Sequence, residues 1–259
     1  MSALDDLITL KQDENFPKVT MTEFKGVLNL HLGTDWIQGG MRLAHPNEIV
    51  FDYVQEMMVW MLFNDSPRHI VQLGLGAASL TKFCYAYFPE SRVTAVDLNP
   101  NVIAVCRATF HLPEDDERLT VINADALDYV ASQKGRQSID VLQVDLYDEH
   151  AQAPVFDSVE FFQQCADAMS DQGMLTINVF GDRSDRGQTI ANLQACFDAV
   201  VWLSEVDGGN MVALAFKQAP AIDFEMLYAK AETIRRQMKL KAVNWVNDLY
   251  YWMENTGKN

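Results

Sequence analysis

The sequence predicts an α/β fold with a mostly parallel sheet that ends in an antiparallel hairpin. Three apolar runs end in glycines or carboxylates: IVQLGLGAAS from residue 70, VTAVDLNP from residue 93 and VLQVDLYDE from residue 141. Buried parallel strands are near-continuous apolar runs, and they present functional groups at their carboxyl ends. From His69 onward, strand patterns alternate with helical patterns, which favours a sheet built from repeated strand–helix units.

The first 63 residues are expected to form a small β-hairpin region that precedes the main domain. The segment 16–44 holds two short alternating runs, FPKVTMTEF and GVLNLHLG, separated at Gly26, and this pattern is typical of antiparallel strands. A helix is expected from Pro46 to about residue 63, before the turn-forming stretch DSP. We therefore divide the chain into an N-terminal region, 1–63, and a main domain, 64–259.

The main domain is expected to alternate strands with helices. Asn99 suits the N-cap of a helix that has Pro100 in its first turn. Asp157 with Glu160 resembles a capping box for a helix that Gly173 ends. A DGG turn joins the last two strands as a hairpin, and the tail from residue 223 has the apolar spacing of an amphipathic helix. In chain order, the expected strands are 69–74, 92–97, 119–123, 139–145, 174–180, 199–206 and 210–216, with helices that include 77–88 and 186–198.

The composition argues against a nucleic-acid partner. The chain of 259 residues has a formal net charge of −16, which repels a phosphate backbone, and no cluster of Lys and Arg with interleaved aromatic residues offsets it. An acidic field concentrates small cations such as amines and sulfonium compounds. Solubility alone also accounts for many acidic compositions.

No membrane segment, disulfide or metal site is expected. No apolar run approaches the roughly 20 residues that span a bilayer, and the acidic start MSALDDLITL lacks the basic residues of a secretory signal. We therefore expect a cytoplasmic protein. The four cysteines lie far apart, which indicates reduced core residues, and the five histidines have no ligand spacing.

The first chemical signal is a glycine loop followed by a carboxylate. Gly74 and Gly76 lie between a buried strand and a helix, where the backbone can approach a ligand closely. Asp97 ends the next strand, about 20 residues on, where an acidic side chain can accept hydrogen bonds from both hydroxyls of a ribose. Ser79 stands where a dinucleotide motif has its third glycine, so a ligand with one nucleoside fits better. A tight turn with a capping carboxylate is the structural alternative.

Three further carboxylates follow later strands. Asp125, in the segment NADA, is placed to accept from an adenine amine, or to cap the next helix. Asp145 and Asp148 follow the fourth strand of the main domain, where a carboxylate can accept a proton from an attacking amine and hold a second cationic nitrogen. They could instead cap the following turn. Tyr147, between them, either lines the pocket or packs.

On these residues the chain resembles the spermidine synthase family of aminopropyltransferases, built on the Rossmann-like fold of class I S-adenosylmethionine-dependent methyltransferases. VDLNP, NADA and DLYD carry the resemblance, which extends over most of the chain. It implies a seven-stranded sheet, a homodimer, a small-molecule amine substrate, and decarboxylated or intact S-adenosylmethionine as donor. Asp97 matches the ribose-binding acid and Asp125 the acid that contacts adenine. Asp145 with Asp148 matches the catalytic and amine-binding pair.

The resemblance also assigns two N-terminal residues and marks one departure. Gln38 lies near the family's binding glutamine, and Tyr53 lies near its tyrosine. Where the family carries GGGDGG the chain has GLGAAS, so Ala77 replaces the aspartate that holds the donor's amino group. Such an aspartate disfavours the carboxylate of intact S-adenosylmethionine, and its replacement makes both donors possible. The leading hypothesis is aminopropyl transfer to an amine. The alternatives are methyl transfer and a non-catalytic adenosyl-binding homologue.

Overall fold

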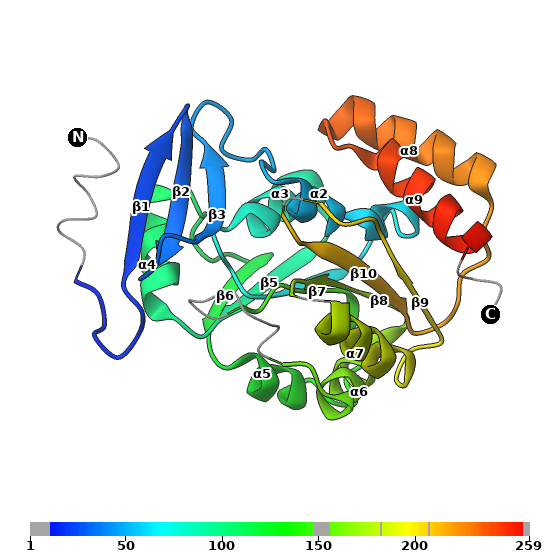
Figure 1. The fold of residues 1–259 in the computed structure, drawn as a ribbon. Helices are drawn as coiled ribbons and strands as arrows, with labels where there is room; N and C mark the ends of the chain where they lie inside the picture. Colours follow the sequence, from blue (N-terminus) through cyan, green and yellow to red (C-terminus); the bar gives the residue numbers. More distant parts are fainter. Residues whose placement is uncertain (1–10, 148–155, 182, 207, 256–259) are drawn as a thin grey trace.

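The computed structural model describes residues 11–147, 156–181, 183–206 and 208–255. In this part of the chain two sheets are present, a three-stranded N-terminal sheet and a seven-stranded central sheet. Figure 1 shows the N-terminal sheet beside the central sheet at the left of the view, with the two C-terminal helices at the upper right. The α/β class expected from the sequence is confirmed.

The N-terminal sheet is antiparallel, in the order β1 (Val19–Phe24), β2 (Val27–Leu32) and β3 (Ile37–Arg42). Lys25 and Gly26 form the turn between β1 and β2, and both have positive φ, as in the tight turns that match strand twist. The third strand extends the expected hairpin region. It contains Gly39 and Gly40, which pack closely on the main domain: a Cβ on Gly39 would lie 2.7 Å from the backbone N of Ala77.

The prediction of a single helix over residues 46–63 is wrong. The structure has two shorter helices, α2 (Asp52–Glu56) and the 3-10 helix η1 (Val59–Leu62). Every residue from 57 to 62 is buried, so the segment has no polar face, and a helical repeat cannot be recognised from its pattern. The side-chain amide of Gln55 donates to the backbone O of Ile49 (3.1 Å) and fixes the start of α2.

The central sheet has the strand order β6-β5-β4-β7-β8-β10-β9. Its first five strands are parallel, and β10 runs antiparallel to both β8 and β9. The expected parallel sheet with a terminal hairpin is thus confirmed. The strands are β4 (His69–Leu73), β5 (Arg92–Asp97), β6 (Leu119–Asn123), β7 (Ile139–Val144), β8 (Met169–Val179), β9 (Ala199–Trp202) and β10 (Met211–Phe216).

Helices cover both faces of the central sheet (Figure 1). One buried apolar cluster joins the sheet to α5, α6 and α7, and the other joins it to the N-terminal sheet, α2, η1, α3, α4, α8 and α9. Asn99 caps α4 as expected, since its side chain accepts from the backbone N of Asn101 (2.9 Å). The helices are α3 (Ser79–Tyr87), α4 (Pro100–Thr109), α5 (Ala126–Ser132), α6 (Val159–Ala168), α7 (Arg183–Gln194), α8 (Phe224–Met238) and α9 (Ala242–Asn255).

The prediction that Asp157 and Glu160 form a capping box at α6 is wrong. Ser158 is the N-cap, and its Oγ accepts from the backbone N of Phe161 (3.1 Å). Asp157 instead accepts a hydrogen bond from the hydroxyl of Thr189 on α7 (2.9 Å). The helix ends at Ala168, and β8 begins directly after it, well before the expected strand start at residue 174.

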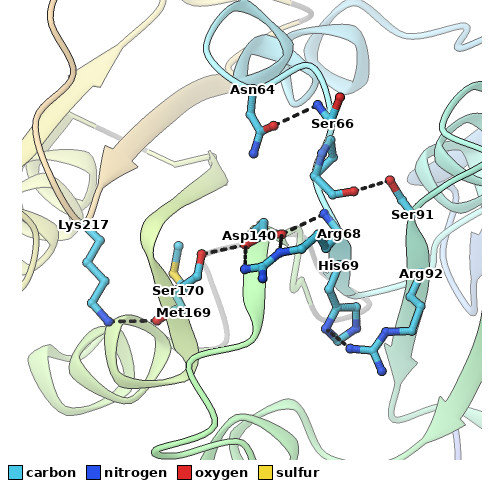
Figure 2. Close-up of polar contacts among 11 residues, drawn as sticks. Asn64, Ser66, Arg68, His69, Ser91, Arg92, Asp140, Met169, Ser170 and Lys217 are labelled. Carbon is cyan, nitrogen blue, oxygen red and sulfur yellow. Dashed lines mark hydrogen bonds and ion pairs between the residues drawn. The ribbon is translucent and has the colours of Figure 1, made fainter.

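A polar network joins the amino ends of three strands, at the edge of the sheet away from the glycine loop (Figure 2). The guanidinium and backbone N of Arg68 donate to Asp140 on β7, and the hydroxyl of Ser170 donates to the same carboxylate (2.7 Å). Burial acts to raise the pKa of Asp140, but these hydrogen bonds outweigh it and lower the pKa below its usual range. The network therefore fixes β4, β7 and β8 relative to one another.

Across the described ranges, the helices are all too short or too polar to cross a bilayer.

Candidate active site

A cavity of about 820 Å³ lies at the carboxyl ends of β4 to β8, and the N-terminal sheet closes one side of it. Parallel α/β sheets place their ligand sites at this edge. Asp148 lies outside the described residues. The other site residues expected from the sequence all line the cavity: Gln38, Tyr53, Gly74, Gly76, Asp97, Asp125, Asp145 and Tyr147.

The loop after β4 needs glycine at its first position. Gly74 has φ +92°, and a Cβ there would lie 2.1 Å from the carbonyl O of Asp145, so a larger residue is excluded by both backbone strain and contact. Gly76 also has positive φ (+50°). The hydroxyl of Ser79 donates to the backbone O of Gly40 on β3 (3.0 Å). A hydrogen bond therefore joins the N-terminal sheet directly to the start of α3, the helix that follows the glycine loop.

Asp97 braces the glycine loop from the neighbouring strand. Its Oδ2 accepts from the backbone N of Leu75 (2.9 Å), and its Oδ1 accepts from that of Asn99 (2.8 Å). Burial raises the pKa of Asp97 to about 6, although both hydrogen bonds lower it. A carboxylate offers about four acceptor sites, so two remain for a ligand such as a ribose.

Asp125 is the N-cap of α5, the role that the sequence offered as an alternative to contact with an adenine amine. Its Oδ1 accepts from the backbone N of Leu127 (2.7 Å) and of Asp128 (3.3 Å). The residue also lines the cavity. Capping fixes the side chain at the cavity wall, so the two roles are compatible.

Asp145 is held by two neighbouring strands. Its backbone N donates to the O of Leu73 on β4 (2.9 Å), and its Oδ1 accepts from the side-chain amide of Asn178 on β8 (3.0 Å). Burial raises the pKa of Asp145 to about 6, while the Asn178 hydrogen bond lowers it. A partly desolvated carboxylate with a raised pKa is suited to accept a proton.

Asn178 was missed by the sequence interpretation. It is the polar residue near the end of an apolar run, LTINVF, and its strand ends at the same edge of the sheet as β7. A polar residue near the carboxyl end of an apolar strand was the signal in the sequence that could have identified Asn178 as a site residue. The pairing with Asp145 itself depends on the register of β7 and β8, which the sequence does not show.

The hydroxyl of Tyr147 bonds the backbone. It donates to the O of Asn178 (2.6 Å) and accepts from the N of Phe180 (2.7 Å), and burial raises its pKa. The ring meets Phe180 edge to face, with centroids 6.2 Å apart. Tyr147 therefore attaches the loop after β7 to the end of β8, and only its ring remains to contact a ligand.

Exposed apolar side chains at the cavity wall were also missed. Trp36 and Ile37, at the turn into β3, are 57% and 49% exposed, and Leu98 after β5 is 55% exposed. Exposed apolar side chains gathered at one cavity indicate a binding surface. The sequence around each of these residues is that of an ordinary turn and does not mark a binding site. They come together at one cavity only in the folded protein.

The charged side chains among the described residues that line the cavity are all acidic. Among the described lining residues they are Asp35, Asp97, Asp125 and Asp145, with no Lys, Arg or His. A cleft lined by one sign of charge concentrates ligands of the opposite sign. Within the described ranges no group of three or more His, Cys, Asp or Glu side chains is arranged to hold a metal ion.

The sheet order and a cavity at this edge define a Rossmann-like domain of the methyltransferase type. A solved probable spermidine synthase from Corynebacterium glutamicum is similar over 88% of this chain and 85% of its own (TM-score 0.73, 20% identity). Human methyltransferase-like protein 13 in complex with SAH matches 73% of this chain and 93% of its own (TM-score 0.66, 23% identity). A spermidine synthase in complex with the transition-state analogue AdoDATO matches 95% and 87% (TM-score 0.68, 17% identity). These likenesses show the fold.

Sequence comparisons identify the family. The model of the spermine/spermidine synthase domain matches residues 51–182. A polyamine aminopropyltransferase of Chromobacterium violaceum is 34% identical over 91% of this chain and 90% of its own length. Another, of Neisseria meningitidis serogroup A, is 36% identical over 79% of this chain and 78% of its own. The chain belongs to the spermine/spermidine synthase family.

Proposed function

We propose that the protein is an aminopropyltransferase that moves an aminopropyl group from decarboxylated S-adenosylmethionine to a small amine. The observation that carries the proposal is the acidic cavity at the carboxyl ends of the strands, because the donor is a sulfonium cation and the acceptor is a cationic amine in water. The names of the curated relatives support the same reaction.

In this reaction the acceptor's amine nitrogen attacks the aminopropyl carbon next to the sulfonium. The new N–C bond forms as the C–S bond breaks, and the bonding pair returns to sulfur, which leaves neutral methylthioadenosine. The proton lost by the attacking nitrogen passes to Asp145, which the Asn178 amide and the Leu73 carbonyl hold at the cavity wall.

The donor's nucleoside is assigned to the β4–β6 end of the cavity. There Asp97 accepts from the ribose hydroxyls, Asp125 accepts from the adenine amine, and the glycine loop allows close approach of the backbone. Asp148 holds the cationic end of the acceptor. Gln38 completes the donor site, and Tyr53 and Tyr147 line the acceptor side.

Ala77 bears on the choice of donor. Its side chain is buried, 2% exposed, and lies against Gly39 of β3; being a methyl group, it cannot attract the donor's amino group as an aspartate would. Methyl transfer from intact S-adenosylmethionine is therefore the second candidate.

Side-by-side calorimetric titration with decarboxylated S-adenosylmethionine, S-adenosylmethionine and methylthioadenosine tests the donor site. Turnover with short diamines, read as methylthioadenosine release, tests the reaction. Tighter binding of the decarboxylated donor with methylthioadenosine release supports aminopropyl transfer. Preference for the intact donor with S-adenosylhomocysteine release supports methyl transfer, and failure to bind all three compounds refutes the adenosyl site.

The homodimer, the cytoplasmic location and the division at residue 64 belong to the same proposal. Light scattering coupled to size-exclusion chromatography tests the first, since a monomer mass of 29.3 kDa would double.

A further inference from the structure

Asn178 occupies a costly position for a polar side chain. It is 3% exposed, and its Oδ1 is buried without a hydrogen-bond partner among the described residues. Burying an unsatisfied polar atom destabilises a protein. Among the described residues, the side-chain amide makes one hydrogen bond, from Nδ2 to Oδ1 of Asp145 (3.0 Å), and this contact accounts for the residue better than packing does.

The backbone around Asn178 is fixed independently of its side chain. Its carbonyl O accepts from the Tyr147 hydroxyl (2.6 Å), and its Cα is paired with Val212 of β10. The amide is thus placed from a rigid strand, and it reaches across to the neighbouring strand end. An ionised carboxylate only accepts hydrogen bonds, so a fixed N–H donor favours the ionised form and one rotamer of Asp145.

We infer that Asn178 is a positioning residue for the transfer reaction, holding Oδ1 of Asp145 so that Oδ2 faces the attacking amine. This inference rests on the proposed function. Among the described residues, Asn178 is the hydrogen-bond partner of the Asp145 side chain. The amide therefore determines both the direction of the carboxylate and its readiness to take a proton.

Among the described residues, Asn178 is the polar group that acts on the pKa of Asp145. Within the described part of the chain, burial raises the pKa of Asp145 and is the larger effect, and the Asn178 hydrogen bond lowers it. Tyr147, on the same loop, is the titratable neighbour in electrostatic contact with it, and Arg186 of α7 and Asp157 act on Tyr147 in turn. Removing the amide should consequently raise the pKa of Asp145 further.

The test compares Asn178→Leu with Thr176→Val. Thr176 is buried on the same strand two residues earlier, but its hydroxyl donates to the backbone O of Met57 (3.1 Å) and not to the site. We expect Asn178→Leu to lower kcat about tenfold to a hundredfold with little change in donor affinity. The acidic limb of its kcat/KM profile should move up by about one pH unit, and Thr176→Val should keep the wild-type profile.

A readout without turnover separates this inference from the proposed function. The Asp145 carboxyl is titrated by carbon-13 NMR, with Asp145→Asn for assignment. A higher midpoint in Asn178→Leu shows that Asn178 controls the ionisation of Asp145, whether or not wild type transfers aminopropyl groups. Absence of transfer by wild type refutes the proposed function, and with it the role of Asn178 in transfer, but leaves this control of Asp145 in place. The inference is overturned if Asn178→Leu keeps the wild-type kcat and the wild-type midpoint, or if Thr176→Val changes both by the same amount.

If Asn178→Leu does not fold, two other variants replace it: Asn178→Gln, which keeps an amide donor, and Asn178→Ser. The inference then requires a smaller midpoint shift in Asn178→Gln than in Asn178→Ser.

Discussion

Replacing Asp145 with asparagine should stabilise the protein while it abolishes turnover. Burial raises the pKa of Asp145 from 3.8 to about 6. Above pH 6 the folded protein therefore holds a buried charge that the unfolded chain exposes to water. Asparagine removes this charge and still accepts the hydrogen bond from Asn178 through its own Oδ1.

The magnitude follows from proton linkage. A shift of about two pKa units corresponds to about 3 kcal/mol at high pH, since each unit is worth about 1.36 kcal/mol. Partial solvent access to the cavity reduces this, so we expect a gain of about 1–3 kcal/mol. Because the folded pKa is raised, the cost is present above pH 6, and most of it disappears as the pH falls toward 4. The gain should shrink over the same window.

Equilibrium urea unfolding of both proteins from pH 4 to pH 8, followed by tryptophan fluorescence, measures the difference. Glu90→Gln removes one negative charge at an exposed position and serves as the control. Binding of methylthioadenosine should stay within about twofold, because Asp145 is not assigned to the nucleoside. A variant less stable than wild type at pH 8, or a gain that does not change with pH, refutes the reasoning.

Three further predictions concern the loops and the far end of the sheet. Gly74→Ala should destabilise the fold by more than about 2 kcal/mol and abolish methylthioadenosine binding, because the added methyl group meets the carbonyl of Asp145 at 2.1 Å; normal binding by calorimetry would contradict this. Tyr147→Phe should cost about 1–3 kcal/mol in urea unfolding, since its hydroxyl bridges two backbone groups; an unchanged midpoint would show that water replaces the bridge. Burial lowers the pKa of His69 from 6.5 to about 4, so the unfolded chain binds a proton in that window that the folded protein does not, and stability falls as pH falls through it. In His69→Gln up to about 3 kcal/mol of this acid sensitivity should vanish; an identical slope in both proteins would count against burial as its cause.

The sequence was sufficient to place polar side chains that stand at the carboxyl ends of strands. Asp97 and Asp145 directly follow apolar runs, and parallel strands bring such positions to one edge of the sheet. The prediction of one helix over 46–63 failed because residues 57–62 are all buried and show no helical period. Asn178 and Trp36 could not be assigned, since their places in the site depend on strand register and on the packing of the N-terminal sheet against the main domain.

The close contact between β3 and the glycine loop limits how the donor site can evolve. A Cβ on Gly39 would lie 2.8 Å from the Cβ of Ala77, and a Cβ on Gly40 would lie 3.0 Å from the ring of Phe51. A larger side chain at Gly39 would displace the loop that we assign to the nucleoside, and one at Gly40 would press on Phe51, which lines the same cavity. Substitutions in the N-terminal sheet and in the donor loop are therefore coupled. A bulkier residue at Gly39 therefore requires a compensating change in the donor loop.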